Sequence, residues 1–281
     1  MSLASPQPTS KSASDVFHIL QRGDVFDLGY PMFQGMPQSP RHPAFTHALV
    51  RRHGDQVRAD GTSSANDIVV TGTHVGTHID ALGHYSDEGV LFGGISALEA
   101  QEGGRLSELG VDEAPIFFGR GVLLDVAATM GLDACPADYE ITADVLDQTA
   151  DSQGTAVRAG DTVLIGTGWG RQFENGAEAF LGWDTGAPGV STEGACWLAD
   201  MNVRAVGAET IAFEYVSPEK GHSELPAHRI LLVENGIYIF ETMNLSALRS
   251  ASVYEFLFVA SPLKIVGATG SPVRPLAVSL S

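Results

Sequence analysis

Four side chains able to bind a metal ion or move a proton lie within eleven residues of the chain. Residues 71–87 read TGTHVGTHIDALGHYSD and contain His74, His78, Asp80 and His84. Uniform scatter of the 9 histidines over 281 residues would place about 0.35 in eleven residues, whereas this stretch has three. Imidazole nitrogen and carboxylate oxygen suit Zn²⁺, Mn²⁺ or Fe²⁺. The segment therefore predicts a metal site without sulfur ligands.

The spacing of these residues favours a catalytic site. His78 and Asp80 are two apart and point to one side of an extended segment, and Gly76 allows the chain to bend so that His74 converges on them. Three protein ligands leave a coordination position for water, which becomes a nucleophile near neutral pH. His84 is then free to carry a proton to the leaving group. Metal-assisted hydrolysis of a carbonyl compound is the predicted reaction class.

Other catalytic patterns fit the chain less well. The two histidines four apart lack the glutamate of the helical H-E-x-x-H motif, and Val75, Gly76 and Thr77 between them are poor helix formers. The glycines of residues 166–170 do not complete G-x-G-x-x-G, and no G-x-S-x-G occurs. The remaining alternative is a polar loop in which the histidines bind nothing, and their clustering argues against it.

Short apolar runs separated by turn residues predict the elements that must position the site. They indicate buried strands at 121–126, 162–166, 203–207, 230–233, 237–240, 255–259 and 273–278. Helical patterns occupy 142–151, with Thr142 as N-cap, and 191–201, with Ser191 at the start. The ENG at 234–236 predicts a hairpin between two strands. We expect an α/β fold with a mixed sheet in a single domain, 16–281, preceded by a disordered tail, 1–15.

The composition excludes several classes of partner. Lys and Arg number 16 against 34 Asp and Glu, so the net charge of −18 argues against binding to nucleic acid or anionic lipid. No run approaches the 18 or so apolar residues of a membrane helix, and the N-terminus lacks the apolar core of a secretory signal. Two cysteines do not make a disulfide scaffold. We therefore expect a cytoplasmic protein that binds neither membranes nor nucleic acid.

The histidine segment resembles the hallmark of a known family. His74-Val-Gly-Thr-His78-Ile-Asp80-Ala-Leu-Gly-His84 matches H-x-G-T-H-x-D-x-x-x-H of the cyclase family of metal-dependent hydrolases, which includes bacterial kynurenine formamidase and isatin hydrolase. Residues 26–37 and 228–248 also resemble family segments, so the resemblance spans roughly 27–277. It implies a swivelling β/α/β-type domain, amide hydrolysis, a Mn²⁺ or Zn²⁺ ion and a homodimer or homotetramer.

The resemblance also assigns roles to residues. It implies metal binding by His74, His78 and Asp80, acid/base catalysis by His84 and, in dinuclear members, a second metal position at His228 and Glu241. Without the family, the last two residues are more typical of a strand edge and a strand terminus. The number of bound ions therefore stays open.

The substrate is less defined than the chemistry. Leu82 replaces the proline that formamidases usually carry, and the C-terminal segment resembles the longer branch of the family. Isatin-like lactams or imides are the expected substrates, with N-formylkynurenine and lactones as alternatives. A catalytically silent protein that binds a metal or small ligand is the alternative outside enzymes, and the presence of His84 argues against it.

Aromatic residues near the polar groups are the candidates for holding a flat ring. The sequence offers Phe33, Tyr85, Phe92, Trp169, Trp183 and Phe213, of which we expect Phe33, Tyr85, Trp169 and Phe213 to contact the substrate. Trp169 is the best placed, because it follows a predicted strand between two glycines. For each of them alone, packing in the core is the more common role.

Overall fold

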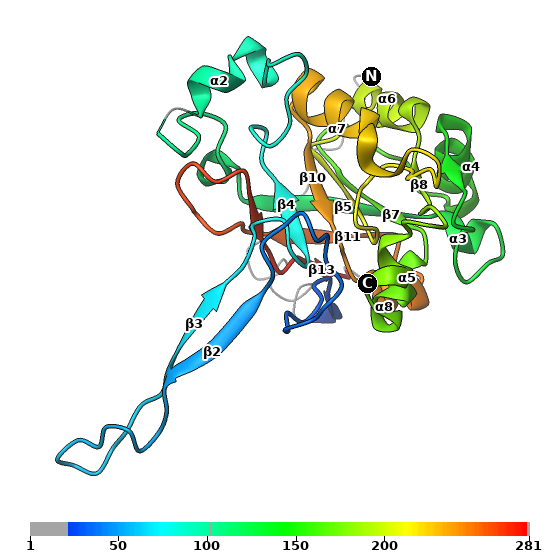
Figure 1. Ribbon diagram of the computed structural model, residues 1–281. Coiled ribbons are helices and arrows are strands. Elements are labelled where there is room, and N and C mark those ends of the chain that lie inside the picture. Colours follow the sequence, from blue (N-terminus) through cyan, green and yellow to red (C-terminus); the bar gives the residue numbers. More distant parts are fainter. Residues whose placement is uncertain (1–21, 102, 280–281) are drawn as a thin grey trace, which may run out of the picture.

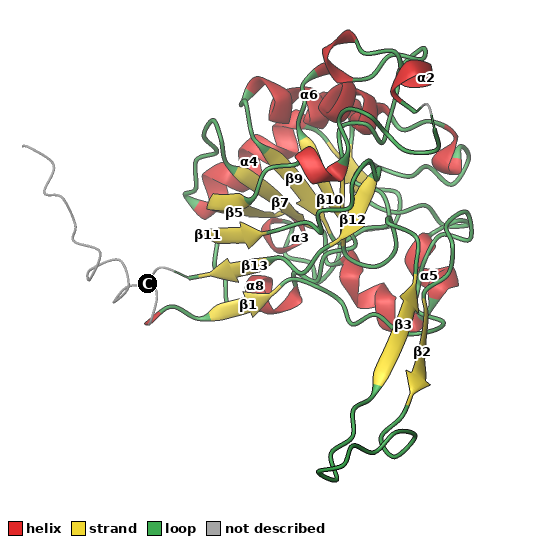
Figure 2. Cartoon of the chain, turned by 90° about the vertical axis from the view of Figure 1, so that its left-hand side faces the viewer, coloured by secondary structure: helices red, strands yellow, loops and turns green. Residues whose placement is uncertain are grey.

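One mixed sheet carries most of the strands of the protein. The structure, a computed structural model, describes residues 22–101 and 103–279, so the expected tail, 1–15, lies outside the described residues. Within them, nine strands form a sheet in the order β1-β13-β11-β5-β7-β9-β10-β4-β12 (Figures 1 and 2). Their bounds are β1 Val25–Asp27, β4 His78–Asp80, β5 Phe117–Asp125, β7 Thr162–Gly166, β9 Ala205–Ala208, β10 Tyr238–Glu241, β11 Glu255–Ala260, β12 Gly270–Pro272 and β13 Leu276–Val278. The prediction of an α/β fold with a mixed sheet is confirmed.

The centre of the sheet is parallel and its flanks are antiparallel. Strands β5, β7, β9 and β10 pair in parallel, whereas β4 is antiparallel to both β10 and β12, and β11 is antiparallel to β5 and β13. The predicted strand at 162–166 coincides with β7, and those at 121–126, 203–207, 237–240, 255–259 and 273–278 overlap observed strands. Parallel strands covered on both faces are continuously apolar, which is why these runs could be recognised.

Alternate residues of the central strands enter two separate cores. Val122, Val163 and Val206 face the side covered by helices α4 and α6. Leu123 and Leu164 face the opposite side, where Phe240, Phe256 and Phe258 pack with Met243, Leu245 and Leu248. This alternation follows from the two-residue repeat of a strand. Both faces of the sheet are therefore packed against a core, and the packed sheet positions the loops at its edges.

The helices are short and cover the sheet. The α-helices are α2 Ala97–Ala100, α3 Val126–Thr129, α4 Ala143–Gln153, α5 Ala177–Leu181, α6 Thr192–Asp200, α7 Pro226–His228 and α8 Ser246–Ser250. The 3₁₀ turns are η1 Phe92–Gly94, η2 Val111–Glu113, η3 Trp169–Asn175 and η4 Gly221–Ser223. The predicted caps are confirmed, because the hydroxyl of Thr142 accepts from the Val145 amide and that of Ser191 from the Gly194 amide. None of the described helices has the length and apolar character needed to cross a bilayer.

The strand predicted at 230–233 and the hairpin after it are wrong. Residues Arg229–Glu234 form the π-helical turn η5, which continues α7. Pro226 begins that helix at a position where its missing amide hydrogen costs nothing. A short apolar run does not distinguish a strand from a buried helical turn. The ENG sequence therefore ends a helical turn and does not join two strands. The sheet is mixed because β4, β11, β12 and β13 pair antiparallel with their neighbours.

A two-stranded arm projects from the body of the protein. Strands β2 Thr46–Arg51 and β3 Asn66–Val70 pair antiparallel in a sheet of their own, and Figure 1 shows them extending well away from the main sheet. Apolar side chains along both strands are exposed, among them Leu49, Ile68, Val69 and Val70. At the base of the arm, β3 leads directly into the segment that holds His74. The remaining strands, β6 Glu140–Ile141 and β8 Gly189–Val190, form a short parallel pair.

Candidate metal centre

Strand β4 and its neighbour β10 form the floor of the site. His78 and Asp80 lie two apart on β4 and are fully buried, as their spacing predicted. Gly76 adopts φ 71°, a conformation favourable to glycine, and so turns the chain into the strand. The antiparallel register places Glu241 of β10 directly opposite His78. Pairing between β10 and β4 therefore adds the carboxylate of Glu241 to the group formed by His78 and Asp80.

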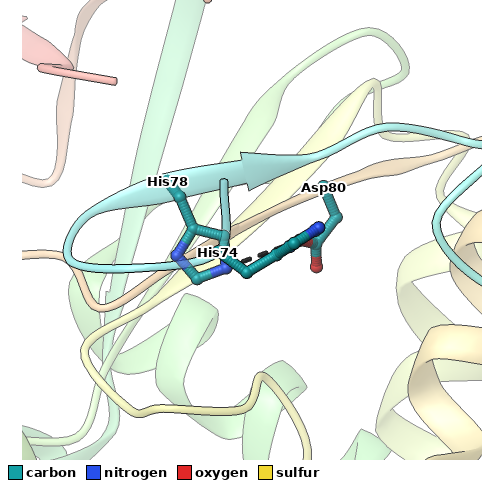
Figure 3. Close-up of side chains that lie close together, drawn as sticks. All are labelled: His74, His78 and Asp80. Atoms are coloured by element: carbon teal, nitrogen blue, oxygen red, sulfur yellow. Dashed lines mark hydrogen bonds and ion pairs between the residues drawn. The ribbon is translucent and has the colours of Figure 1, made fainter. Parts of the chain in front are cut away.

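His74 reaches the same point from the preceding loop. Its Nδ1 donates to Asp80 Oδ1 over 2.6 Å, and its Nε2 lies 2.9 Å from the hydroxyl of Thr269. Figure 3 shows His74 and Asp80 side by side, with His78 adjacent. Gly270 leaves room for the ring, since a Cβ at this residue would lie 2.6 Å from Cε1 of His74. The structure thus brings the three predicted ligands together.

His228 joins this group from the turn at α7. Its Nδ1 donates to Glu214 Oε2 over 2.6 Å, so in the neutral ring the lone pair is on Nε2. That Nε2 lies 3.5 Å from Asp80 Oδ2 and 3.4 Å from Glu241 Oε1. The candidates for a second metal position are therefore in direct contact with the first set.

His78 is held in the same way as His228, with Nδ1 on an acceptor and Nε2 facing the two carboxylates. Its Nδ1 donates to the carbonyl of Gly76 over 2.8 Å. Its Nε2 lies 3.5 Å from Asp80 Oδ1 and 3.4 Å from Glu241 Oε2. His78 and His228 thus each have one nitrogen held by an acceptor and the other directed at Asp80 and Glu241. This is the arrangement in which imidazole binds metals.

The donor set fits a divalent cation. Oδ2 of Asp80 is buried and has no hydrogen-bond partner among the described residues, which is costly for a carboxylate. In a tetrahedral site with bonds of about 2.1 Å, neighbouring ligand atoms are about 3.4 Å apart. The separations of 3.4–3.5 Å between the Nε2 atoms of His78 and His228 and the oxygens of Asp80 and Glu241 have this length. Ligand atoms of His74, His78 and Asp80 lie within 4.8 Å of one another, as do those of Glu214, His228 and Glu241.

The electrostatics of the cluster favour positive charge. Burial alone would lower the pKa of His78, but its contacts with Asp80 and Glu241 raise that pKa to about 10. Burial is likewise outweighed at His228, where the charge of Glu214 and the contact with Asp80 raise the pKa well above its ordinary value. Burial would raise the pKa of Asp80, but His84 and His74 lower it well below the usual range. Such a cluster attracts protons or a cation.

His84 lies beside this cluster and lines a cavity of about 240 Å³. Its ring is 4.0 Å from that of His74 and 6.0 Å from that of His228, measured between centroids. Burial lowers the pKa of His84 to about 3, so its ring is neutral near pH 7. The ring of Tyr85 lines the same cavity, 5.5 Å from that of His228. The cavity therefore combines a neutral imidazole with an aromatic wall beside the donor set.

The other aromatic candidates lie away from the lining of this cavity. Trp169 is buried in a core and donates its Nε1 hydrogen to the carbonyl of Phe180. Phe213 is fully buried, and its amide donates to Glu241 Oε1 over 2.8 Å. Phe33 is 48% exposed and contacts Phe173 edge to face, with 6.4 Å between centroids. Phe213 supports the site through its backbone, a role that residue type alone does not indicate.

Four residues at the site were missed by sequence reasoning. Glu214 fixes His228, while Arg41, His42 and His222 line the cavity. All four are distant in sequence from the motif, so spacing gives no signal for them. Glu214 follows directly from a buried apolar stretch, and a carboxylate in that position is a signal for a polar contact within the fold.

Removing the charge of Glu214 is expected to weaken metal binding. In the variant Glu214→Gln, the Nδ1 hydrogen of His228 loses its charged acceptor, so the metal affinity should fall by about 10–100-fold. Competition with a chromophoric chelator measures this for Mn²⁺ and Zn²⁺. Glu193→Gln, at an exposed position of α6, is the matched control and should bind as the unmodified protein does. Equal affinity of both variants would show that Glu214 does not support the site.

Comparison with known proteins agrees with the fold and identifies the family. The model of the Cyclase family matches residues 26–215. An isatin hydrolase of Roseibium aggregatum is 29% identical over 229 residues, which cover 78% of this chain and 77% of that protein. A kynurenine formamidase of Sphingopyxis alaskensis is 26% identical over 252 residues, covering 90% and 96%. The crystal structure of a novel cyclase superposes with a TM-score of 0.83 at 26% identity, covering 93% of this chain and 90% of the other. The chain belongs to the Cyclase family and is related to these two enzymes.

Proposed function

We propose that the protein is a metal-dependent hydrolase that cleaves the C–N amide bond of a small aromatic or cyclic amide, an isatin-like lactam or imide. One observation carries this proposal. His78 and His228 direct their free nitrogens at Asp80 and Glu241, and His84 lies beside them in a cavity. A volume of about 240 Å³ is below the ordinary range of ligand pockets, about 300–1,000 Å³, and so favours a small substrate.

We propose Mn²⁺ or Zn²⁺ as the ion. His74, His78 and Asp80 would hold it, and His228 and Glu241 would complete the set or hold a second ion. A mixed nitrogen and carboxylate donor set supports both metals. The ion would polarise the substrate carbonyl and lower the pKa of the attacking water.

The chain itself supplies proton transfer and positioning. His84, which lines the cavity beside the donor set, accepts the proton of the attacking water and then delivers that proton to the departing nitrogen. The ring of Tyr85 packs against the flat face of the substrate. The carbonyl of Gly76 and the carboxylate of Glu214 accept from the Nδ1 atoms of His78 and His228, and so keep both rings oriented through the reaction.

A spectrophotometric screen distinguishes the substrates. The metal-loaded protein is incubated with isatin, with N-formylkynurenine and with an aryl lactone. Opening of isatin is the expected result. Cleavage of the formamide instead would favour the alternative of a kynurenine formamidase, which the 96% coverage of the Sphingopyxis alaskensis enzyme supports. Bound metal without hydrolysis of any compound would favour the catalytically silent binding protein.

We further propose that the protein forms a homodimer or homotetramer through the arm. Ile68 and Val70 lie on one face of β3 and are 49% and 53% exposed. An exposed apolar strand pair is a site of association. The exposed thiol of Cys196 favours a reducing compartment and therefore the cytoplasm.

Charges on the arm are expected to dissociate the assembly. The double variant Ile68→Lys with Val70→Lys would bring like charges together at the contact, so sedimentation analysis should show monomers. Leu98→Lys is the control, because Leu98 is 77% exposed on α2, and it should leave the mass unchanged. An unmodified protein that sediments as a monomer would contradict the proposed assembly, and an unchanged double variant would contradict the role of the arm.

A further inference from the structure

A second cavity adjoins the one that His84 lines. The outer cavity measures about 370 Å³ and shares Ser39, Arg41 and His222 with the inner cavity. Trp183, which is 50% exposed, and Lys220 also line the outer cavity. Because it lines both spaces, Arg41 borders a ligand held in the inner cavity as well as the outer space.

Arg41 is a cation without an anionic partner at this junction. No carboxylate of the described residues forms an ion pair with it, whereas Lys220 is paired with Glu224 over 2.8 Å. Burial is the main cause that lowers the pKa of both His42 and His222, and the charge of Arg41 lowers both further. Both rings are therefore neutral near pH 7, so the guanidinium carries the positive charge of the junction. A chain with a net charge of −18 otherwise repels anions.

We propose that the substrate carries a carboxylate and that Arg41 binds it while the amide lies at His84. This inference rests on the proposed hydrolase function and narrows the substrate class to anionic aryl amides or lactams, so neutral isatin should be opened more slowly than a lactam that carries a carboxylate. A guanidinium presents parallel N–H donors that match the two oxygens of a carboxylate. Arg41 is exposed at the rim of the cavity, so its guanidinium is open to a carboxylate that projects outwards from the inner space. Arg41 is thus a specificity-determining residue.

Matched substrates test the inference. Formanilide is compared with its 2-, 3- and 4-carboxylate derivatives, and kcat/KM is measured for each with the metal-loaded protein. The preferred carboxylate isomer should exceed formanilide by about 10–100-fold, the range of a charged hydrogen bond. In Arg41→Gln this ratio should fall to about one, and Arg41→Lys should retain part of it. Arg58→Gln removes the same charge from outside both cavities and should preserve the ratio.

Two kinetic results would overturn the inference. One is the absence of a preference for any carboxylate isomer, and the other is an equal loss on all substrates in Arg41→Gln. If no anilide is hydrolysed, the proposed function fails for this substrate class. A measurement of benzoate binding then tests the role of Arg41. Calorimetry with benzoate and benzamide should show benzoate bound about tenfold more weakly by Arg41→Gln than by the unmodified protein, with benzamide unchanged. Equal benzoate affinity of the two proteins would contradict the role of Arg41.

Discussion

Replacement of Asp80 by asparagine is expected to lower kcat/KM by at least about 1,000-fold, together with loss of the bound metal. Asp80 is fully buried at the centre of the site. One oxygen contacts His74 at 2.6 Å and His78 at 3.5 Å, and the other lies 3.5 Å from His228. Asparagine keeps the shape of the side chain but removes the charge and one acceptor. No other described residue forms an ion pair with all three histidines. Metal analysis and steady-state kinetics on the same preparation measure both effects.

Glu209 provides the matched control for this substitution. It is a buried carboxylate outside the cavity, and its Oε2 accepts from the amides of Thr167 and Gly168 over 2.8 and 2.6 Å. Burial raises its pKa, and glutamine keeps an oxygen that can accept from both amides. This variant should keep its metal and its activity. If Asp80→Asn folds, as circular dichroism can show, and still binds metal with full activity, the assignment of Asp80 is wrong.

Replacement of His84 by glutamine is expected to lower kcat by about 100–10,000-fold, the range of general acid–base catalysis, while the metal content stays unchanged. The ring of His84 lines the cavity, and within the described part of the chain neither of its nitrogens forms a hydrogen bond. Glutamine fills a similar volume but does not exchange a proton near pH 7. Metal analysis followed by single-turnover kinetics separates this effect from a loss of the ion.

A second histidine variant controls for the loss of an imidazole. His47 lies on the arm, where its Nε2 is 2.8 Å from Asp67 Oδ2, and His47→Gln should keep full activity. If His84→Gln loses metal as well as activity, His84 is a ligand and the proton must be moved by another group. If it keeps both, the site does not use His84. The same two measurements therefore distinguish an acid/base residue from a ligand and from a bystander.

The elements and the candidate ligands that depend on neighbouring residues were predictable from the sequence. Strand β7 coincides with its predicted range, because every side chain of this central parallel strand is buried and the run is continuously apolar. His78, Asp80 and the turn at Gly76 also follow from local spacing, since two residues of one strand must share a face. Thr142 and Ser191 begin helices because a hydroxyl side chain can accept from an amide three residues later.

The parts that depend on long-range pairing could not be predicted in this way. Glu241 is at the site because β10 pairs with β4 in one register, and a shift by one residue would turn its side chain to the other face. Glu214 is there because the loop after β9 folds back onto α7. The run at 230–233 was misread as a strand because Ile230, Leu231 and Leu232 are all buried in a helical turn. Burial of that turn comes from its packing on α6 and β10, which the local pattern does not contain.

Titration of activity against metal content tests the central claim most directly. The full chain is treated with a chelator, metal analysis confirms removal, and Mn²⁺ or Zn²⁺ is added in steps while hydrolysis of the best substrate from the screen is followed. The account predicts that activity disappears with the metal, returns in proportion to the ion bound, and does not return in Asp80→Asn. Full activity of the metal-free protein would contradict it.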